Sequence, residues 1–244
     1  MKLALTLGRE IGKGGFGTVY EKADEPGMCI KVSNRANTCR RWSNEYKKIT
    51  QLVDNIDKSD LGARFTKRMQ NVAIIKPTHF DEHSGTCYMF MPRVYRPEGV
   101  KKEIEPTIQA HLGCDIGLQY ISKHVHRGLL KSMAYELGIA MGCIHYIGKN
   151  DAQNVELFLG KMYMSRKPQL FLADFDMSEQ VPNPNAINEA VIRKLAWSLD
   201  AALCFPKRDV DNKLYDLFRL GYTQVADATG TRQAAEHVME IFDL

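Results

Sequence analysis

The sequence predicts an α+β chain, with a β-rich N-terminal part and a mostly helical C-terminal part. Three strand-like runs fill residues 3–32 and are joined by turn signals that include Pro26-Gly27. In the C-terminal third, apolar residues recur every three or four positions, as they do on the buried face of a helix. With 244 residues, of which 44% are hydrophobic, the chain can form one domain or two small lobes around a sizeable core.

Composition and charge argue against several classes of protein. No apolar run approaches the roughly 18 residues of a membrane span, and the first seven residues are too short for a signal peptide. The six cysteines are scattered without metal-ligand spacing, so we expect an intracellular, cytoplasmic protein in a reducing compartment. The net charge of +4 is mild, and basic pairs such as Arg40-Arg41 and Lys47-Lys48 are interpreted as solvated surface. No nucleic-acid partner is therefore expected.

Residues 11–20 contain the pattern Gly-x-Gly-x-x-Gly-x-Val. The pattern consists of Gly12, Gly14, Gly15, Phe16, Gly17 and Val19. Glycine lets the backbone pass close to a polyphosphate and present N–H groups to it, and Lys31 on the next apolar run can neutralise phosphate charge. A β-branched and aromatic run follows the glycines, so the segment predicts a hairpin instead of a dinucleotide-binding turn, after which a helix must begin. It is not a Walker-type loop, because Gly14 stands where Ser or Thr would hold magnesium. A glycine-rich hairpin without a ligand is the alternative.

This glycine pattern and the strand lysine resemble the N-terminal lobe of protein kinases. The resemblance implies a bilobal protein-kinase-like fold. Its N-terminal nucleotide-binding lobe, at residues 1–94, would be a small antiparallel sheet with one main helix. The C-terminal catalytic lobe, at residues 95–244, would be mostly helical. It also implies that the glycine-rich loop covers the phosphates of ATP and that Lys31 binds the α- and β-phosphates.

Residues 39–52 predict a helix, because Trp42, Tyr46, Ile49 and Leu52 recur at helical spacing. Glu45 lies within this helix. The kinase resemblance implies that Glu45 pairs with Lys31 and holds it at the phosphates. A glutamate on a Lys-rich helix is otherwise most often a solvated surface residue.

Residues 72–77 and 86–94 predict two more strands. By resemblance, the second ends at a hinge that binds the adenine ring, with Met91 to Val94 as its residues and Met89 or Phe90 behind the pocket. Val19 and Cys29 would then form part of an apolar roof over the base. Each of these apolar residues could equally face an ordinary core. Residues 97–106, charged and bounded by prolines, are expected to connect the lobes.

A polar loop at residues 149–155 follows a predicted helix at 129–146, whose His145 is expected to be structural. The resemblance implies that Asp151 orients the acceptor hydroxyl group and accepts its proton. Five residues later Glu156 takes the place of the Asn that holds magnesium in kinases, with Asn154 as the alternative ligand. Glutamate keeps an oxygen ligand for a hard cation. Gln153 replaces a lysine of protein kinases, which argues against ordinary protein-kinase chemistry.

The run Leu170-Phe171-Leu172-Ala173 predicts a strand that ends at Asp174-Phe175-Asp176. In the kinase resemblance Asp174 binds Mg²⁺, or Mn²⁺ in its place, at the β- and γ-phosphates. Asp176 stands where kinases usually have glycine. The short stretch that follows predicts no long activation segment. Trp197, on the next predicted helix, is expected in the core.

A second, shorter resemblance rests on Asp151-Ala-x-x-Val-Glu156 and Phe205-Pro206. It is to an uncharacterised kinase-like domain family of fungal proteins, and it implies no activity.

Three functions follow from these residues as hypotheses. The first is an ATP- and Mg²⁺-dependent phosphotransferase, an atypical Ser/Thr protein kinase acting on an unidentified protein substrate. The second is a small-molecule kinase of the aminoglycoside or choline phosphotransferase type, favoured by the short segment after Asp176. The third is a nucleotide-binding pseudokinase that serves as an interaction module, in which Gln153, Glu156 and Asp176 are marks of lost activity.

Overall fold

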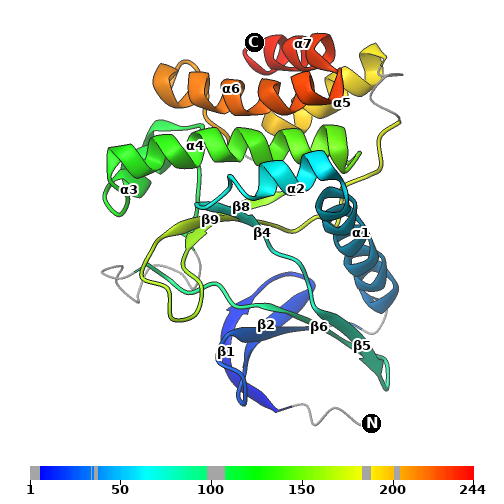
Figure 1. Ribbon diagram of the computed structural model, residues 1–244. Coiled ribbons are helices and arrows are strands. Elements are labelled where there is room, and N and C mark those ends of the chain that lie inside the picture. Colours follow the sequence, from blue (N-terminus) through cyan, green and yellow to red (C-terminus); the bar gives the residue numbers. More distant parts are fainter. Residues whose placement is uncertain (1–5, 34, 36–37, 98–107, 183–187, 201–203) are drawn as a thin grey trace.

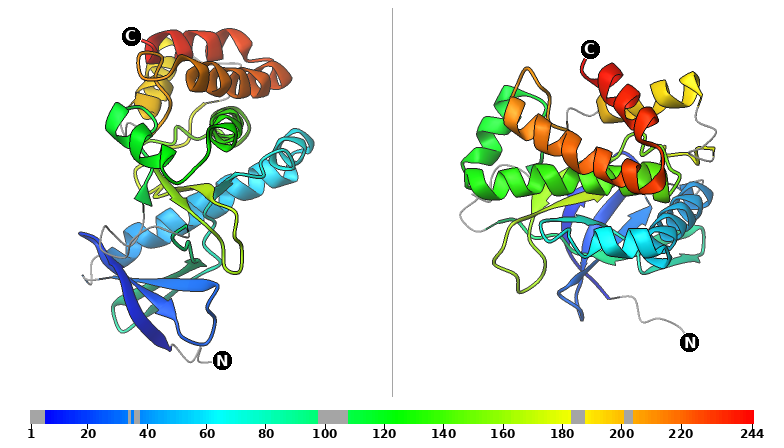
Figure 2. Two further views of the ribbon diagram at one scale, coloured as in Figure 1. Left: turned by 90° about the vertical axis from the view of Figure 1, so that its left-hand side faces the viewer. Right: turned by 45° about the horizontal axis from the view of Figure 1, so that its top comes forward.

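The computed structural model describes residues 6–33, 35, 38–97, 108–182, 188–200 and 204–244. It has an N-terminal antiparallel sheet at one end, a helical layer at the other and a second sheet between them (Figures 1 and 2). The strands are β1 (Leu7–Lys13), β2 (Gly17–Lys22), β3 (Met28–Ser33), β4 (Val72–Ile74), β5 (His79–His83), β6 (Thr86–Pro92), β7 (Ile108–Gln109), β8 (Glu156–Gly160) and β9 (Gln169–Ala173). The helices are α1 (Cys39–Lys58), α2 (Asp60–Thr66), α3 (Asp115–Ser122), α4 (Arg127–Gly142), the π-helical η2 (Cys143–Ile147), α5 (Glu189–Asp200), α6 (Asn212–Thr229) and α7 (Arg232–Phe242).

The N-terminal sheet has the strand order β1-β2-β3-β6-β5, with antiparallel neighbours throughout. Its register aligns Val19 with Lys31 and Lys31 with Met89. Two pairs further along, Cys29 lies opposite Met91. Residues directly opposite each other in an antiparallel pair project from the same face. The sheet therefore presents Lys31 together with these apolar side chains on one face.

Helix α1 packs on the N-terminal sheet and extends toward the helical layer (Figure 1). Near its start Cys39 and Trp42 form a small buried cluster with Cys87 and Met89 of β6. Further along, its apolar stripe belongs to the large core of the C-terminal part. The stripe residues in that core are Ile49, Leu52 and Ile56. The helix predicted at 39–52 is thus confirmed, and it joins two hydrophobic cores.

The second sheet has the order β4-β9-β8-β7, and it supports the loops that carry most predicted site residues. Strand β4 pairs with β9 in parallel, while β9–β8 and β8–β7 are antiparallel. Behind this sheet α4 crosses α6 at close range. A Cβ atom on Gly138 would lie 2.0 Å from the backbone oxygen of Phe218 on α6, so only glycine fits there. These two helices give the C-terminal part its core.

The α+β class, the antiparallel N-terminal sheet and the helical C-terminal part are confirmed. Strand β5 was missed by the sequence analysis, because His79–His83 is a mostly exposed polar segment without an apolar alternation. The prediction that Trp197 is in the core is wrong, since its exposed fraction is 65%. The predicted connector lies almost entirely in residues outside the described ranges, and the boundary at residue 94 stays a prediction.

Candidate functional site

The glycine-rich turn between β1 and β2 lies against the start of α1. Its backbone closes through a hydrogen bond from the Gly14 N–H to the Gly17 oxygen, 2.8 Å long. Gly17 is buried, and a Cβ atom there would lie 2.4 Å from Cη2 of Trp42. A Cβ atom on Gly15 would meet nothing within 4 Å, so the turn is closed on the Trp42 side and open at its tip. At the tip Phe16 is 43% exposed. Gly12 pairs with Val19 at the end of the hairpin.

Lys31 and Glu45 come together beneath this turn. The Lys31 Nζ and Glu45 Oε1 atoms are 3.8 Å apart, and the ammonium group also lies 4.9 Å from the ring centre of Trp42. Glu45 is buried, with 4% of its surface exposed. Burial raises the pKa of Glu45 to about 7, although Lys31 opposes the rise, because a desolvated carboxylate is costly to ionise. The predicted pair forms an ion pair, at a distance longer than a hydrogen bond.

Two further carboxylates, from Asp174 and Glu156, lie close to Lys31. Glu156 is opposite Ala173 in the β8–β9 ladder, and Asp174 directly follows Ala173 in the chain. Burial raises the pKa of Asp174, against the attraction of Lys31. Burial also raises the pKa of Glu156, and the negative charge of Asp174 adds to that rise. Mutual influence of this kind places the ammonium group and the carboxylates in one electrostatic site.

The backbone of Asp174 has a φ of 60°, in the left-handed region that a non-glycine residue rarely adopts. Its Oδ1 atom is buried and has no hydrogen-bond partner among the described residues. The same holds for Oε2 of Glu45 and Oδ1 of Asp176. Strained backbone and unsatisfied buried acceptors are typical of functional sites, where a ligand supplies the missing partner.

The donor set fits a hard cation only in part. Within the described ranges, no three His, Cys, Asp or Glu side chains are arranged to hold a metal ion by themselves. Mg²⁺, however, usually keeps several waters and takes one or two carboxylates together with phosphate oxygens. Glu156 and Asp174 meet that smaller requirement, and the free Oδ1 of Asp174 is a suitable ligand atom. Asn154, the alternative ligand, is exposed and has a φ of 64°.

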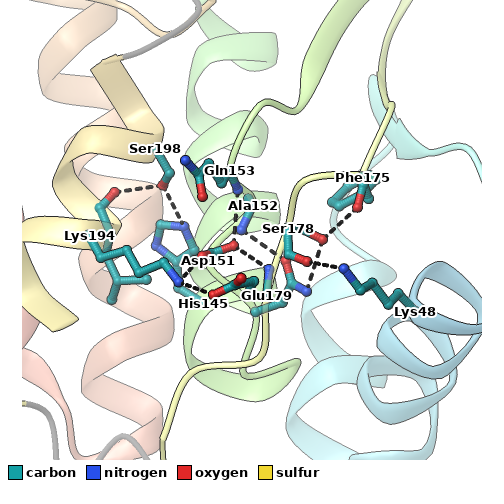
Figure 3. A network of polar contacts seen from close by, with 12 residues as sticks. Lys48, His145, Asp151, Ala152, Gln153, Phe175, Ser178, Glu179, Lys194 and Ser198 are labelled. Atoms are coloured by element: carbon teal, nitrogen blue, oxygen red, sulfur yellow. Dashed lines mark hydrogen bonds and ion pairs between the residues drawn. The ribbon is translucent and has the colours of Figure 1, made fainter. Parts of the chain in front are cut away.

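Asp151 is fully buried and lies in a separate network of polar contacts (Figure 3). Its Oδ1 accepts hydrogen bonds from the N–H groups of Gln153, at 3.1 Å, and Glu179, at 2.7 Å. Its Oδ2 is 2.9 Å from Nζ of Lys194, an ion pair whose angles are not those of a hydrogen bond. Among the described residues, the polar contacts of Asp151 do not include Lys31, Glu45, Glu156 or Asp174. The structure therefore brings Lys31, Glu45, Glu156 and Asp174 together, and it engages Asp151 elsewhere.

His145 lies beside Asp151 and interacts with its charge and with its backbone. The Nδ1 atom of His145 is 2.8 Å from the hydroxyl oxygen of Tyr222, and burial lowers the pKa of the imidazole to about 4. A neutral, buried histidine agrees with the structural role expected for it. Lys194 from α5 and Lys48 from α1 approach the loop from opposite sides (Figure 3). Lys48 donates a hydrogen bond of 2.6 Å to the Ser178 oxygen, which fixes the segment after β9.

Of the predicted base-binding residues, Val19, Cys29 and Met91 lie on the face of the sheet that carries Lys31. Cys29 is buried, and burial raises the pKa of its thiol to about 12, so it remains a neutral apolar group. Met91 is half-buried on the same face. Val94 packs on Gly160, where a Cβ atom would lie 2.2 Å from its Cγ1. The neighbouring Arg93 N–H donates to the Gly27 oxygen, so part of the predicted hinge backbone already has a protein partner.

Sequence reasoning gave no role to three groups that complete the site. Asp176 forms an ion pair with Arg41, whose guanidinium group also lies 4.3 Å from the ring centre of Phe16. Trp42 fills the space beneath the glycine-rich turn. Lys194 neutralises Asp151. The position of Asp176, two residues after Asp174, could have indicated that it belongs to the site. No local pattern in the sequence indicates the contact of Lys194 with Asp151.

Comparison with solved structures finds kinase domains at low sequence identity. One is a Plasmodium kinase domain with a TM-score of 0.48 and 13% identity, covering 84% of this chain and 65% of that one. Another is the kinase domain of Mycobacterium tuberculosis PknI, a double mutant, with a TM-score of 0.39 and 18% identity over 97% of this chain and 95% of that one. This chain thus spans just under two thirds of the Plasmodium domain. No family model and no curated protein sequence matches it. Among the described helices, none is both long and apolar enough to cross a bilayer.

Proposed function

We propose that this chain binds ATP with Mg²⁺ and transfers the γ-phosphate to a hydroxyl group, as an atypical kinase. The observation that carries the proposal is the convergence of Lys31, Glu45, Glu156 and Asp174 beneath a glycine-rich turn. These residues come from β3, α1, β8 and the end of β9. A phosphate chain needs cations on its oxygens and a backbone that can approach closely, and the arrangement offers both.

Each residue has a defined role in this proposal. Lys31 would neutralise the α- and β-phosphates, and Glu45 would hold its ammonium group in place. Gly14 and Gly15 would present backbone N–H groups at the open tip of the turn. Glu156 and Asp174 would hold Mg²⁺, or Mn²⁺, which when bound neutralises charge on the transferred phosphoryl group. Positioning and charge neutralisation account for most of such catalysis.

We infer that the acceptor is a Ser or Thr hydroxyl of a protein, oriented by Asp151. In the state described, the Asp151 carboxylate is fully buried and pairs with Lys194, so acceptor binding requires this contact to open. The segment between β9 and α5 is short, and this favours a small hydroxylated molecule as the alternative acceptor. The buried pairing of Asp151 with Lys194 favours a second candidate function. In it, the chain binds a nucleotide without transferring phosphate and acts as an interaction module.

Nucleotide binding can be measured with Trp42 as the reporter. The sequence has two tryptophans, and Trp197 is exposed, so Trp197→Phe leaves Trp42 as the single indole. Because Trp42 contacts Gly17 and lies 4.9 Å from Lys31 Nζ, ATP at the site should change its fluorescence. In this background Lys31→Ala should weaken the affinity for ATP, measured by the change in Trp42 fluorescence, at least about tenfold, since it removes a charge-assisted contact. The control Lys67→Ala removes an exposed lysine of the α2 end and should leave the response unchanged.

Phosphate transfer is tested with labelled ATP and Mg²⁺ or Mn²⁺, with and without a cell lysate, beside Asp174→Ala. Labelled protein bands that disappear in the variant support a protein kinase. Label confined to the small-molecule fraction supports the alternative acceptor. A saturable Trp42 response without any transfer supports the nucleotide-binding module. Absence of both the fluorescence response and the transfer would contradict the proposal.

A further inference from the structure

A basic groove of about 590 Å³ lies along α1, beside the face that carries Glu45. The α1 residues that line it recur at helical spacing, and the segment after β9 contributes one acidic residue. The lining residues are Arg40, Arg41, Asn44, Lys47, Lys48, Gln51 and Asp176. Four cationic side chains therefore face one carboxylate in a single groove. The lining does not include Lys31, Glu45, Glu156 or Asp174 of the proposed nucleotide site.

Among the described residues, three of the four cations have no acidic partner. Arg41 pairs with Asp176, and Lys48 donates its hydrogen bond to the backbone of Ser178. Arg40 and Lys47 are exposed, and among the described residues neither has an acidic partner. The groove thus retains uncompensated positive charge, which attracts an anion.

The position of these cations on the helix adds to that positive charge. Arg40 and Arg41 lie in the first turn of α1, which has no acidic residue. The N-cap residue Thr38 makes no side-chain capping bond within the described part of the chain. Backbone N–H groups already give a helix N-terminus partial positive charge, so arginines there are unfavourable unless an anion compensates them.

We propose that this groove binds a phosphorylated side chain of a protein partner. Arginine forks match phosphate oxygens with paired hydrogen bonds, and Lys47 can add a further charged contact. From Arg40 to Gln51 the groove runs about 17 Å at 1.5 Å per residue, a length suited to a short peptide segment. Asp176 lies on one side of the groove and adds negative charge there. A continuous phosphate backbone in the groove would have to pass this carboxylate. A single phosphate group bound by Arg40 and Lys47 would not.

The groove is connected to the nucleotide site through Arg41. Its guanidinium group pairs with Asp176 and lies on the ring of Phe16 at the tip of the glycine-rich turn. A phosphate group that engages Arg41 competes with both contacts, so occupation of the groove should alter the ATP response of Trp42. This second step rests on the proposed function, whereas binding in the groove does not.

The test uses the full chain and a fluorescein-labelled peptide of about twelve Gly and Ser residues with one phosphoserine, in fluorescence polarisation without ATP. We expect the phosphopeptide to bind at least about tenfold more tightly than the same peptide without phosphate. The double variant Arg40→Ala/Lys47→Ala should lose at least about tenfold in affinity. The control Arg64→Ala/Lys67→Ala removes the same charges from exposed positions at α2 and should stay within about twofold of wild type. All four residues are exposed, so both variants should fold.

Three results would overturn the proposal. Equal loss in both double variants would indicate attraction by net charge alone. A single-stranded oligonucleotide that binds more tightly than the phosphopeptide and loses affinity only in Arg40→Ala/Lys47→Ala would indicate a nucleic-acid surface. Displacement of the phosphopeptide by an equal concentration of inorganic phosphate would indicate a site for the free ion. Because no step uses ATP, a failure here leaves the proposed nucleotide site unaffected.

Discussion

Glu45 gives a quantitative prediction, because burial and its ion pair with Lys31 act on its ionisation in opposite directions. Burial raises its pKa from the ordinary 4.5 to about 7, Lys31 lowers it, and the charges of Asp174 and Asp176 raise it further. The folded state therefore binds the proton of Glu45 more tightly than the unfolded chain does. The stability that this preference provides is fully present below pH 4.5 and is lost as the pH rises through about 7.

The magnitude follows from the two pKa values. At about 1.4 kcal/mol for each tenfold change in proton affinity, the free energy of unfolding should fall by about 3 kcal/mol across this pH window through Glu45 alone. Glutamine has nearly the same shape and cannot ionise. The variant Glu45→Gln should therefore resemble wild type near pH 5 and be more stable than wild type by up to about 3 kcal/mol at pH 8.

Urea denaturation followed by circular dichroism between about pH 5 and 8 measures this difference. The control Glu240→Gln removes a carboxylate from an exposed position of α7, and its curve should run parallel to that of wild type. If Glu45→Gln is instead less stable than wild type at pH 8, the attraction of Lys31 outweighs the cost of burial. That result would refute the conclusion that burial, and not Lys31, dominates the pKa of Glu45.

Three more predictions concern the turn and the loop around Asp151. Gly17→Ala should lower the free energy of unfolding by about 1–3 kcal/mol, because its Cβ atom would lie 2.4 Å from the indole of Trp42. Gly15→Ala, where a Cβ atom meets nothing within 4 Å, should leave it nearly unchanged, and thermal denaturation of both variants measures the difference. Lys194→Met should cost about 1–3 kcal/mol by leaving the buried Asp151 without a counter-charge, and adding Asp151→Asn should recover most of that loss in a double-mutant cycle. Burial lowers the pKa of His145 to about 4, so its contribution is present above pH 6.5 and lost as the pH falls toward 4; His145→Gln should therefore show a shallower loss of stability over that window.

Local patterns in the sequence predicted those parts of the fold that depend on neighbouring residues. The apolar stripe of α1 is periodic, so its start and its buried apolar face could be predicted, whereas the pairing of Glu45 with Lys31 rested on the kinase resemblance. The hairpin of β1 and β2 follows from glycines before a β-branched run. That Lys31 and Asp174 would meet rested on a resemblance, because the 142 residues between them carry no pairwise signal of contact.

The features that were missed depend on contacts distant in the sequence. Strand β4 pairs with β9 because both enter the same core, which no property of Val72–Ile74 indicates. Trp197 was expected in the core, but the buried stripe of α5 runs through Ile192, Leu195 and Leu199. At 100° per residue, Trp197 projects about 200° from Leu195, on the opposite side of the helix. The ammonium group that neutralises Asp151 comes from Lys194, 43 residues later in the chain.

Helix α1 connects these observations mechanically. Its second half is fixed in the C-terminal core by Ile49, Leu52 and Ile56, while its first turn contacts the N-terminal sheet and the glycine-rich turn. A helix moves as a rigid element, so a small tilt about the fixed half displaces the first turn most. Glu45 lies between the two, and its 3.8 Å distance from Lys31 is just beyond that of a hydrogen bond. A ligand in the groove that draws Arg41 away from Asp176 therefore acts on the end of α1 where displacement is largest, and the Lys31–Glu45 distance is the quantity it should change.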